Sequence, residues 1–371
     1  MEWSYKQPVK IYFGRNKVKE LGKIIEQQNF KKGVLITTKH FLKNGLASEL
    51  EKNLENRIIL IFDGFSPNPD WSEVEACADK IRENEIDFIV ALGGGSVLDG
   101  AKAASVFSQM KKDEFKSFEL EKEKLTKHLP VIAIPTTAGT GSEVTNVAVL
   151  SNREKNTKKP LSMDAFYPFA AIVDPVLTYE MPPYLTASTG MDVLCHAVEA
   201  FWSKGHQPIC DLLAIHAANL VFQYIKRAYD FQDDEEAREK MAEASLLAGL
   251  AFGIPKTTAV HACSFPLTNI YGIPHGEACA LTLDFFIRLN GKYDARTKNL
   301  AIRLGFTNVE EFANEVFCLK KYLNLRTSLK DFSLSKEERK KLIEKSHHPN
   351  LLNNPVFITD EELEELYEEL S

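Results

Sequence analysis

Several features are missing from this 371-residue sequence, and each absence excludes a class of protein. No apolar run reaches the ~18 to 20 residues that a membrane-spanning helix needs. The six cysteines are scattered and form no paired framework, which favours a reducing compartment. A formal net charge of −7 argues against nucleic-acid or anionic-membrane surfaces. Because residues 1–6 do not resemble a signal peptide, we expect a soluble, cytoplasmic protein that binds neither nucleic acid nor membranes.

Internal repeats and low-complexity segments are also lacking. The chain is long for a single core, and its 44% hydrophobic content suffices to fill two. Up to Asp174, short β-rich runs alternate with amphipathic segments such as 18–27 and 74–84, which indicates a largely parallel sheet covered by helices. The β-rich runs are residues 34–37, 58–62, 88–92, 131–134 and 170–173.

Strand signals vanish after Asp174, and long helical patterns follow. These patterns cover residues 185–202, 209–229, 235–252, 278–290, 308–322 and 336–345. The charged stretch 110–127 is interpreted as a solvated helix or loop. We therefore predict an α/β dinucleotide-binding domain over residues 1–177 and an all-helical, metal-binding domain over residues 178–371.

Four side chains between residues 191 and 275 have the character of a metal site. Asp192 and His196 are four residues apart, so in a helix over 190–202 they project from one face, as two ligands of one ion must. His261 and His275 follow, fourteen residues apart. Each alone would more ordinarily be an N-cap aspartate or a hydrogen-bonded core histidine. Together, one carboxylate and three imidazoles suit Fe(II) or Zn(II) and poorly suit Mg or Ca, so we predict a catalytic metal site.

A glycine-rich turn about a hundred residues upstream predicts a nucleotide site. The apolar run 86–92 leads into Gly93-Gly94-Gly95-Ser96 and then into a predicted helix over 97–107. Such a turn lets backbone N–H groups approach a diphosphate, with the positive end of the helix dipole behind them. The pattern is neither the usual dinucleotide motif nor a nucleoside-triphosphate loop, and alone it would equally fit an ordinary turn. A second small-residue loop, 135–143, offers hydroxyls to a ribose and a nicotinamide amide.

These motifs, taken in order, make the sequence resemble the iron-containing (group III) alcohol dehydrogenases. The motifs are the runs 93–102, 135–145, 190–196 and 261–276, and the likeness extends from Val9–Gly14 to Asn354–Pro355. The resemblance implies a dehydroquinate synthase-like fold and reversible hydride transfer between NAD or NADP and an aldehyde or alcohol. It further implies one divalent metal ion, with Fe(II) favoured over Zn(II). We also expect a homodimer.

The same resemblance assigns cofactor-binding positions. It implies that Gly94, Gly95 and Ser96 hold the diphosphate, with Asp99 and Lys102 belonging to the same motif. The other implied contacts are Thr136, Thr137, Ser142 and Thr145 along the nucleotide, Lys159 at the ribose and Asn68 near the adenosine. From the residues alone, Lys159 would be an exposed lysine and Asn68 an ordinary turn asparagine.

Two departures from the family pattern bear on the chemistry. NAD-selective members place an aspartate after the second strand, where this sequence has Thr38 followed by Lys39. Without that carboxylate, repulsion toward a ribose 2′-phosphate is removed, and NADP becomes admissible beside NAD. Phe265 stands where many members have a histidine near the nicotinamide. The proton for the alkoxide is therefore expected to come by another route, such as ribose hydroxyls or water.

A third departure, ahead of His261, bears on the substrate. The run Pro255–Ala259, together with residues 263–268, is similar to the branch of the family that reduces phosphonoacetaldehyde and sulfoacetaldehyde. Lys256, Thr257 and Thr258 are predicted to hold the anionic tail of a small aldehyde, with Phe265 as a further substrate-site residue. The alternative is that Lys256 points to solvent at a helix start.

Other functions stay open beside this one. A general short-chain alcohol dehydrogenase, acting on butanol or 1,3-propanediol, fits the same motifs. A dehydroquinate synthase-like cyclase shares the fold and the His275–Ala278 motif, but it needs a basic cluster where residues 63–69 read Asp-Gly-Phe-Ser-Pro-Asn-Pro. The first metal ligand of such a cyclase is a glutamate, whereas this sequence has the pair Asp192 and His196. A non-catalytic metal- or nucleotide-binding regulator is disfavoured because both halves of a working site are intact.

Overall fold

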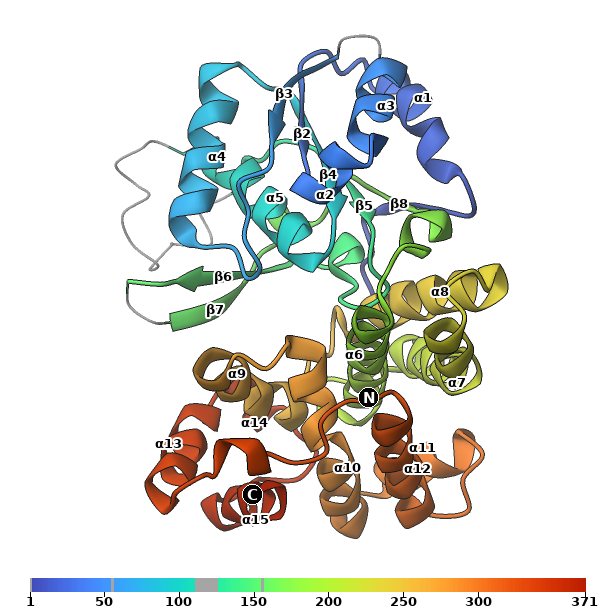
Figure 1. Cartoon of the computed structure of the whole chain (residues 1–371), viewed down its shortest axis with the longest axis vertical. Helices are drawn as coiled ribbons and strands as arrows, with labels where there is room; N and C mark the ends of the chain where they lie inside the picture. Colours follow the sequence, from blue (N-terminus) through green and yellow to red (C-terminus); the bar gives the residue numbers. More distant parts are fainter. Residues whose placement is uncertain (1, 55–56, 111–125, 155–156) are drawn as a thin grey trace. The chain divides into compact units, whose positions relative to one another are not determined.

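The computed structural model describes residues 2–54, 57–110, 126–154 and 157–371. Most of the charged stretch predicted as a solvated helix or loop, residues 111–125, lies outside this description. The chain divides into two compact units, shown in Figure 1. The sheet unit comprises Lys6–Thr137 and Gly141–Thr178, and the helical unit comprises Met1–Tyr5, Ala138–Thr140 and Tyr179–Ser371.

The sheet unit is built on a six-stranded sheet whose paired strands are all parallel, in the order β1-β8-β5-β4-β2-β3. The strands are β1 (Lys10–Phe13), β2 (Gly33–Ile36), β3 (Ile58–Phe62), β4 (Phe88–Gly93), β5 (Val131–Pro135) and β8 (Ala170–Val173). Every residue of β2, β4, β5 and β8 is buried. Strands covered on both faces are expected to be continuous apolar runs, and this is how they stand out in the sequence. The predicted parallel sheet is confirmed.

Side-chain alternation along the strands separates two hydrophobic cores. On β2, Val34 and Ile36 pack with helices α4 and α5, while Leu35 packs on the opposite face with α1 and α3. The helices of this unit are α1 (Leu21–Gln27), α2 (Lys39–Lys43), α3 (Leu46–Asn53), α4 (Trp71–Glu83) and α5 (Gly95–Phe107). The 3₁₀ turns are η1 (Lys17–Glu20), η4 (Ser142–Val144), η5 (Asp164–Phe166) and η6 (Pro175–Thr178).

An antiparallel hairpin, β6 (Val147–Asn152) and β7 (Thr157–Ser162), forms a second small sheet that the sequence did not predict. β6 alternates half-buried and buried residues, and its inward residues Ala148 and Leu150 join the core on the α4 and α5 side. β7 has the polar sequence Thr-Lys-Lys-Pro-Leu-Ser, which lacks a strand pattern of its own. β7 therefore depends on its pairing with β6, and β6 in turn packs against α5.

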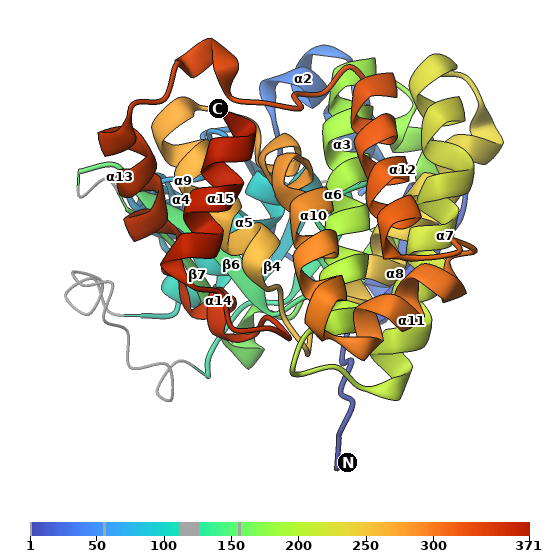
Figure 2. The same ribbon diagram turned by 90° about the horizontal axis from the view of Figure 1, so that it is seen from below.

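The helical unit contains helices alone among its described regular elements, apart from one 3₁₀ turn, η7 (Lys330–Phe332). They are α6 (Pro183–Trp202), α7 (Pro208–Asp230), α8 (Glu235–Phe252), α9 (Ala259–Tyr271), α10 (His275–Tyr293), α11 (Ala295–Arg303), α12 (Val309–Tyr322), α13 (Lys336–Ser346), α14 (Pro349–Leu352) and α15 (Asp360–Leu370). α6 and α10 are buried on nearly all sides at the centre, and α10 packs against α6, α9 and α12 (Figure 2). The predicted all-helical part is confirmed.

α7 is the one helix in the described part of the chain that is long and apolar enough, by length and composition, to cross a membrane. The same test is passed by core helices of water-soluble proteins, and α7 packs along α6 and α8. The helix is therefore weak evidence for a membrane span, and the expected absence of membrane binding stays a prediction.

Candidate active site

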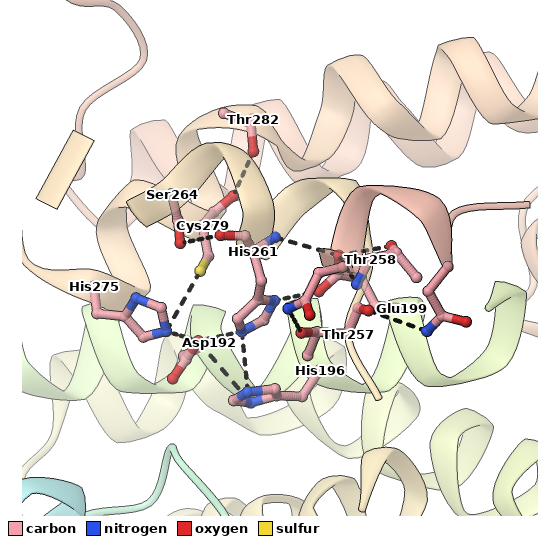
Figure 3. A network of polar contacts seen from close by, with 12 residues as sticks. Asp192, His196, Glu199, Thr257, Thr258, His261, Ser264, His275, Cys279 and Thr282 are labelled. Carbon is pink, nitrogen blue, oxygen red and sulfur yellow. Dashed lines mark hydrogen bonds and ion pairs between the residues drawn. The ribbon is translucent and has the colours of Figure 1, made fainter. Parts of the chain in front are cut away.

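The four predicted metal ligands come together in the helical unit, from three helices. Asp192 and His196 lie one turn apart on α6, His261 lies on α9, and His275 is the first residue of α10 (Figure 3). Gly276 permits this approach, because a Cβ atom there would lie 2.1 Å from the Ser188 carbonyl oxygen and 3.0 Å from Asp192 Cβ. The glycine after His275 is therefore required for the start of α10 to reach α6.

Each of the four side chains has a donor atom within 4.0 Å of a donor atom of another. His261 Nε2 lies 3.0 Å from His196 Nε2. Asp192 Oδ1 lies 3.6 Å from His261 Nε2, 3.9 Å from His196 Nδ1 and 4.0 Å from His275 Nε2. Within the described residues Oδ1 is buried and has no hydrogen-bond partner, which costs about 1–3 kcal/mol unless a ligand satisfies it. The set fits a divalent ion.

Burial and neighbouring charges shift the pKa values of these residues in different directions. Burial lowers the pKa of His196 to about 4, so its imidazole is neutral at pH 7 and can ligate. Burial alone would raise the pKa of Asp192, but His196, His275 and His261 together hold it well below its usual range. Burial would lower the pKa of His261, but Cys279 and Glu199 raise it well above its usual range, so this imidazole releases a proton when it ligates a metal. Asp192 and His196 are already in the protonation states that bind a cation.

A buried glutamate that the sequence did not single out supports the predicted ligand His261. Glu199 lies on α6, three residues after His196, with its side chain fully buried. It accepts hydrogen bonds from Thr258 N at 2.9 Å and Thr258 Oγ1 at 2.7 Å, and it contacts His261 Nδ1 (Figure 3). A carboxylate on the outer nitrogen of an imidazole fixes its tautomer and turns the other nitrogen toward the metal. The available signal was an acidic residue within the otherwise apolar stretch that follows His196 on α6.

The residues predicted to bind the substrate lie at the start of α9 and within it. Lys256 has a left-handed backbone (φ 66°), and its Nζ donates to the Gly253 carbonyl at 2.7 Å. The Thr257 hydroxyl accepts a hydrogen bond from Asn350 Nδ2 at 2.7 Å, whereas the Thr258 hydroxyl helps to hold Glu199. The hydroxyl groups of both threonines are therefore engaged in hydrogen bonds to other side chains of the helical unit.

Phe265 lies beside the metal ligands. Its ring is stacked almost parallel to that of His275, with centroids 6.2 Å apart. Its other neighbour is His348, 4.8 Å away and edge-on. Since a phenyl ring neither donates nor accepts a proton, Phe265 gives this position an apolar surface.

The predicted diphosphate loop lies between β4 and α5 in the sheet unit. Gly94 is the N-cap of α5 and provides no side-chain hydrogen bond to the first turn. A Cβ at Gly94 would lie 3.3 Å from Thr137 Oγ1, so this loop and the predicted nucleotide loop after β5 touch closely. Backbone N–H groups at the start of a 13-residue helix whose N-cap makes no side-chain hydrogen bond fit a diphosphate. Ser96 Oγ accepts a hydrogen bond from Asn68 N at 3.1 Å, which brings Asn68 to the same end of the sheet.

Asp99 and Lys102 fix the second nucleotide loop in place. Lys102 is fully buried, and its Nζ donates to Ser142 Oγ at 2.7 Å and to the Ser142 carbonyl at 3.0 Å. Asp99 Oδ2 accepts from Val149 N at 2.9 Å, and its other oxygen accepts from Ser142 Oγ. Ser142 and Thr145 are buried around this network, which ties the loop to α5.

The remaining predicted cofactor residues occupy three places in the sheet unit. Thr136 is buried and donates its backbone N–H to the Gly93 carbonyl at 3.1 Å. Thr38, half-buried after β2, is the N-cap of α2. Lys159 lies exposed on β7, whereas its neighbour Lys158 donates to Asn68 Oδ1 at 2.6 Å.

Comparison with known proteins agrees with this geometry. The family model for iron-containing alcohol dehydrogenase matches residues 8–175, and that for the C-terminal part of the Fe-containing alcohol dehydrogenase family matches residues 186–371. The chain belongs to the iron-containing alcohol dehydrogenase family. The predicted family and the predicted enzyme class are thereby confirmed.

Individual relatives of this alcohol dehydrogenase differ in substrate. Alcohol dehydrogenase 4 of Saccharomyces cerevisiae (strain YJM789) is 32% identical over 360 residues, covering 95% of this chain and 94% of the yeast protein. The 1,3-propanediol dehydrogenase of Citrobacter freundii is 36% identical over 293 residues, covering 78% and 75%. The crystal structure of sulfoacetaldehyde reductase from Bifidobacterium kashiwanohense in complex with NAD+ is 50% identical with a TM-score of 0.95, covering 100% of this chain and 99% of that one.

This iron-type alcohol dehydrogenase uses NAD(P) and a divalent metal, as its family does. Each cofactor has a fitting place in one unit: the start of α5 after a glycine turn in the sheet unit, and a cluster of donor side chains in the helical unit. The sequence predicted the residues of both places but not Glu199, which supports one of them.

Replacing Glu199 with glutamine is expected to weaken metal binding about tenfold, because the neutral amide orients the His261 imidazole less well. Glutamine keeps the shape and one acceptor for Thr258. Chelator competition monitors the affinity, and Glu315→Gln on the half-exposed surface of α12 is the control. Equal affinities in the wild type and Glu199→Gln would show that Glu199 only fills space.

Proposed function

We propose that this alcohol dehydrogenase reduces a small aldehyde with an anionic tail to the alcohol, with sulfoacetaldehyde as the favoured substrate and phosphonoacetaldehyde as its analogue. The observation that carries this proposal is the likeness, over the whole chain, to a sulfoacetaldehyde reductase at 50% identity. The convergent donors of α6, α9 and α10 support the chemistry. The reductant is NADH or NADPH.

In this proposal the metal ligands are Asp192, His196, His261 and His275, with Fe(II) favoured over Zn(II). When bound, such an ion polarises the aldehyde oxygen as a Lewis acid and favours hydride arrival from the nicotinamide. The four side chains hold and orient the ion, and Glu199 fixes the orientation of the His261 imidazole. Because the phenyl ring of Phe265, beside His275, carries no exchangeable proton, the proton for the product oxygen comes from ribose hydroxyls or water.

The nucleotide is assigned to residues 1–177 and the metal to residues 178–371. Gly94, Gly95 and Ser96 would hold the diphosphate at the start of α5, where the helix dipole favours negative charge. The other assigned contacts are Thr38, Asn68, Thr136, Thr137, Ser142, Thr145 and Lys159, with Asp99 holding the loop that contains Ser142.

The anionic tail is assigned to the segment before α9, with Phe265 beside it. Lys256 supplies a positive charge two residues before Thr258, whose hydroxyl and backbone N–H touch the support of His261. Asn350 and Asn353 hold this segment in place, through Thr257 Oγ1 at 2.7 Å and the Pro255 carbonyl at 2.7 Å. Because the backbone of this segment is fixed at both ends, little of its conformational entropy is lost when Lys256 binds the anionic tail.

The experiment is NADH and NADPH oxidation by the purified enzyme across a panel of aldehydes, with the bound metal measured in the same preparation. We expect higher kcat/KM for sulfoacetaldehyde and phosphonoacetaldehyde than for propanal and butanal. Preference for uncharged aldehydes would overturn the substrate assignment in favour of a general short-chain alcohol dehydrogenase, to which the 1,3-propanediol dehydrogenase relative points. Absence of turnover on every aldehyde would overturn the reductase assignment itself.

The assembly and location are part of the proposal. Cys77, Cys195, Cys210, Cys263, Cys279 and Cys318 are all free, which suits the reducing cytoplasm. A homodimer is expected, and sedimentation equilibrium at micromolar concentration decides between one chain and two.

The choice of nicotinamide depends on Thr38. Replacing Thr38 with aspartate is expected to lower kcat/KM for NADPH about fivefold more than for NADH, since two unit charges 4 Å apart repel by ~1 kcal/mol in water. Lys43→Gln, at the other end of α2, lowers the net charge by the same unit and serves as the control. Equal losses with both cofactors would place Thr38 away from the adenosine ribose.

A further inference from the structure

A thiol lies at the metal cluster in addition to the four assigned ligands. Cys279 is fully buried on α10, one turn after His275, and its Sγ lies 3.9 Å from His275 Nε2 (Figure 3). One donor atom from each of Asp192, His261, His275 and Cys279 lies within 4.8 Å of the other three. Within the described residues, this cluster contains no other cysteine.

Two further cysteines show why proximity in sequence is not enough. Cys195 adjoins His196 on α6, and Cys263 is two residues after His261 on α9; both are fully buried. Neither contributes to the cluster of donors, because residues one or two apart on a helix face different directions. Cys279, four residues after His275, faces the same way as that ligand.

The separations within the cluster suit coordination. Zinc–sulfur and zinc–nitrogen bonds of about 2.3 and 2.0–2.1 Å place the two donor atoms roughly 3.1 to 3.8 Å apart at the bond angles of about 90° to 120° found among five ligands. The observed 3.9 Å between Cys279 Sγ and His275 Nε2 is near that separation. A second observation also points to a ligand: Asp192 Oδ1, in the same cluster, is buried without a hydrogen-bond partner among the described residues.

We infer that Cys279 is an additional metal ligand, an inference that rests on the metal site of the proposed function. On metal binding the thiol releases its proton to solvent, and the thiolate sulfur forms a bond to the divalent ion. No electrons are transferred in this step. A sulfur donor makes the set softer than one carboxylate and three imidazoles, which raises its preference for Zn(II).

The experiment uses the metal alone as the probe. The full-length protein is stripped of metal and loaded with one equivalent of Co(II), and its absorption spectrum is recorded. We expect a near-ultraviolet thiolate-to-cobalt charge-transfer band in the wild type and in Cys263→Ser, and none in Cys279→Ser. Stoichiometric Co(II) binding without the band, or a band that persists in Cys279→Ser, would overturn the inference.

Zinc affinity gives a second readout that does not depend on activity. In competition with a chelator, Cys279→Ser should bind Zn(II) at least about tenfold more weakly than Cys263→Ser, because a ligand is lost rather than a packing atom. Equal affinities would contradict the inference. If Cys279→Ser does not fold, X-ray absorption of the zinc-loaded wild type decides the question, since a sulfur neighbour at about 2.3 Å is either present or absent.

The role of Cys279 and the proposed function would be overturned by different results. An enzyme that binds one metal ion and reduces sulfoacetaldehyde, but shows no sulfur bonded to the metal, would overturn the role of Cys279 and leave the proposed function standing. An enzyme that binds no metal would overturn the assigned metal site.

Discussion

Replacing His261 with alanine is expected to remove the bound metal and to lower kcat/KM by about a thousandfold or more. Lewis-acid activation of a carbonyl contributes several kcal/mol of transition-state stabilisation, and ~4 kcal/mol corresponds to roughly three powers of ten in rate. His261 lies close to two of the other assigned ligands: its Nε2 is 3.0 Å from His196 Nε2 and 3.6 Å from Asp192 Oδ1. Without its imidazole, these donors surround an incomplete site.

The measurement combines metal content, far-ultraviolet circular dichroism and turnover. Asp192→Ala, His196→Ala and His275→Ala should behave alike, each folded and inactive. His216→Ala, on the exposed face of α7, is the matched control and should keep both metal and activity. A His261→Ala protein with wild-type metal stoichiometry would show that the ion is held elsewhere.

The sequence predicted the sheet and the long helices because burial on both sides leaves a strong pattern. β4 and β5 are apolar at every position that faces a helix layer, and α8 was predicted with its observed bounds. α9 was missed as a complete helix because it contains Pro266, which lacks a backbone N–H and usually ends a helix. The hairpin partner β7 was missed because its polar residues show no alternation.

The donor residues were predictable, but their supporting contacts were not. Asp192 and His196 share a helix, so their spacing already implied one face. Glu199 also lies on that helix, yet its partner Thr258 is fifty-nine residues away, and no local pattern connects the two. Cys279 is similar: its spacing from His275 is that of a helix turn, but only the packing of α10 on α6 and α9 brings it to Asp192 and His261.

Tertiary contacts also change the role that we assign to Asp99 and Lys102. Lys102 and Asp99 were assigned through a motif associated with the diphosphate, and the structure shows what they hold: Ser142, Val149 and the loop between them. Burying a lysine is tolerated here because several oxygen atoms and one carboxylate surround its ammonium group. The motif therefore joins two loops that are predicted to bind the nucleotide, rather than serving one contact.

Replacing Lys256 with alanine should lower kcat/KM about tenfold to a hundredfold for sulfoacetaldehyde and phosphonoacetaldehyde while leaving propanal reduction nearly unchanged. A charge-assisted contact contributes roughly 1.5 to 3 kcal/mol, which corresponds to this factor. The contrast between substrates matters because Lys256 Nζ also donates to the Gly253 carbonyl at 2.7 Å, where α8 ends. Loss of that contact alone would disturb every substrate alike.

Lys204 provides the matched control for Lys256. Its Nζ donates to the Leu352 carbonyl at 2.8 Å, so Lys204→Ala also removes one positive charge and one lysine-to-carbonyl hydrogen bond from the helical unit. If both lysine variants lose activity equally on charged and uncharged aldehydes, the loss comes from the backbone contact or from net charge. Only a loss confined to Lys256→Ala and to the charged aldehydes assigns that lysine to the anionic tail, because propanal has no anionic group for its ammonium to bind.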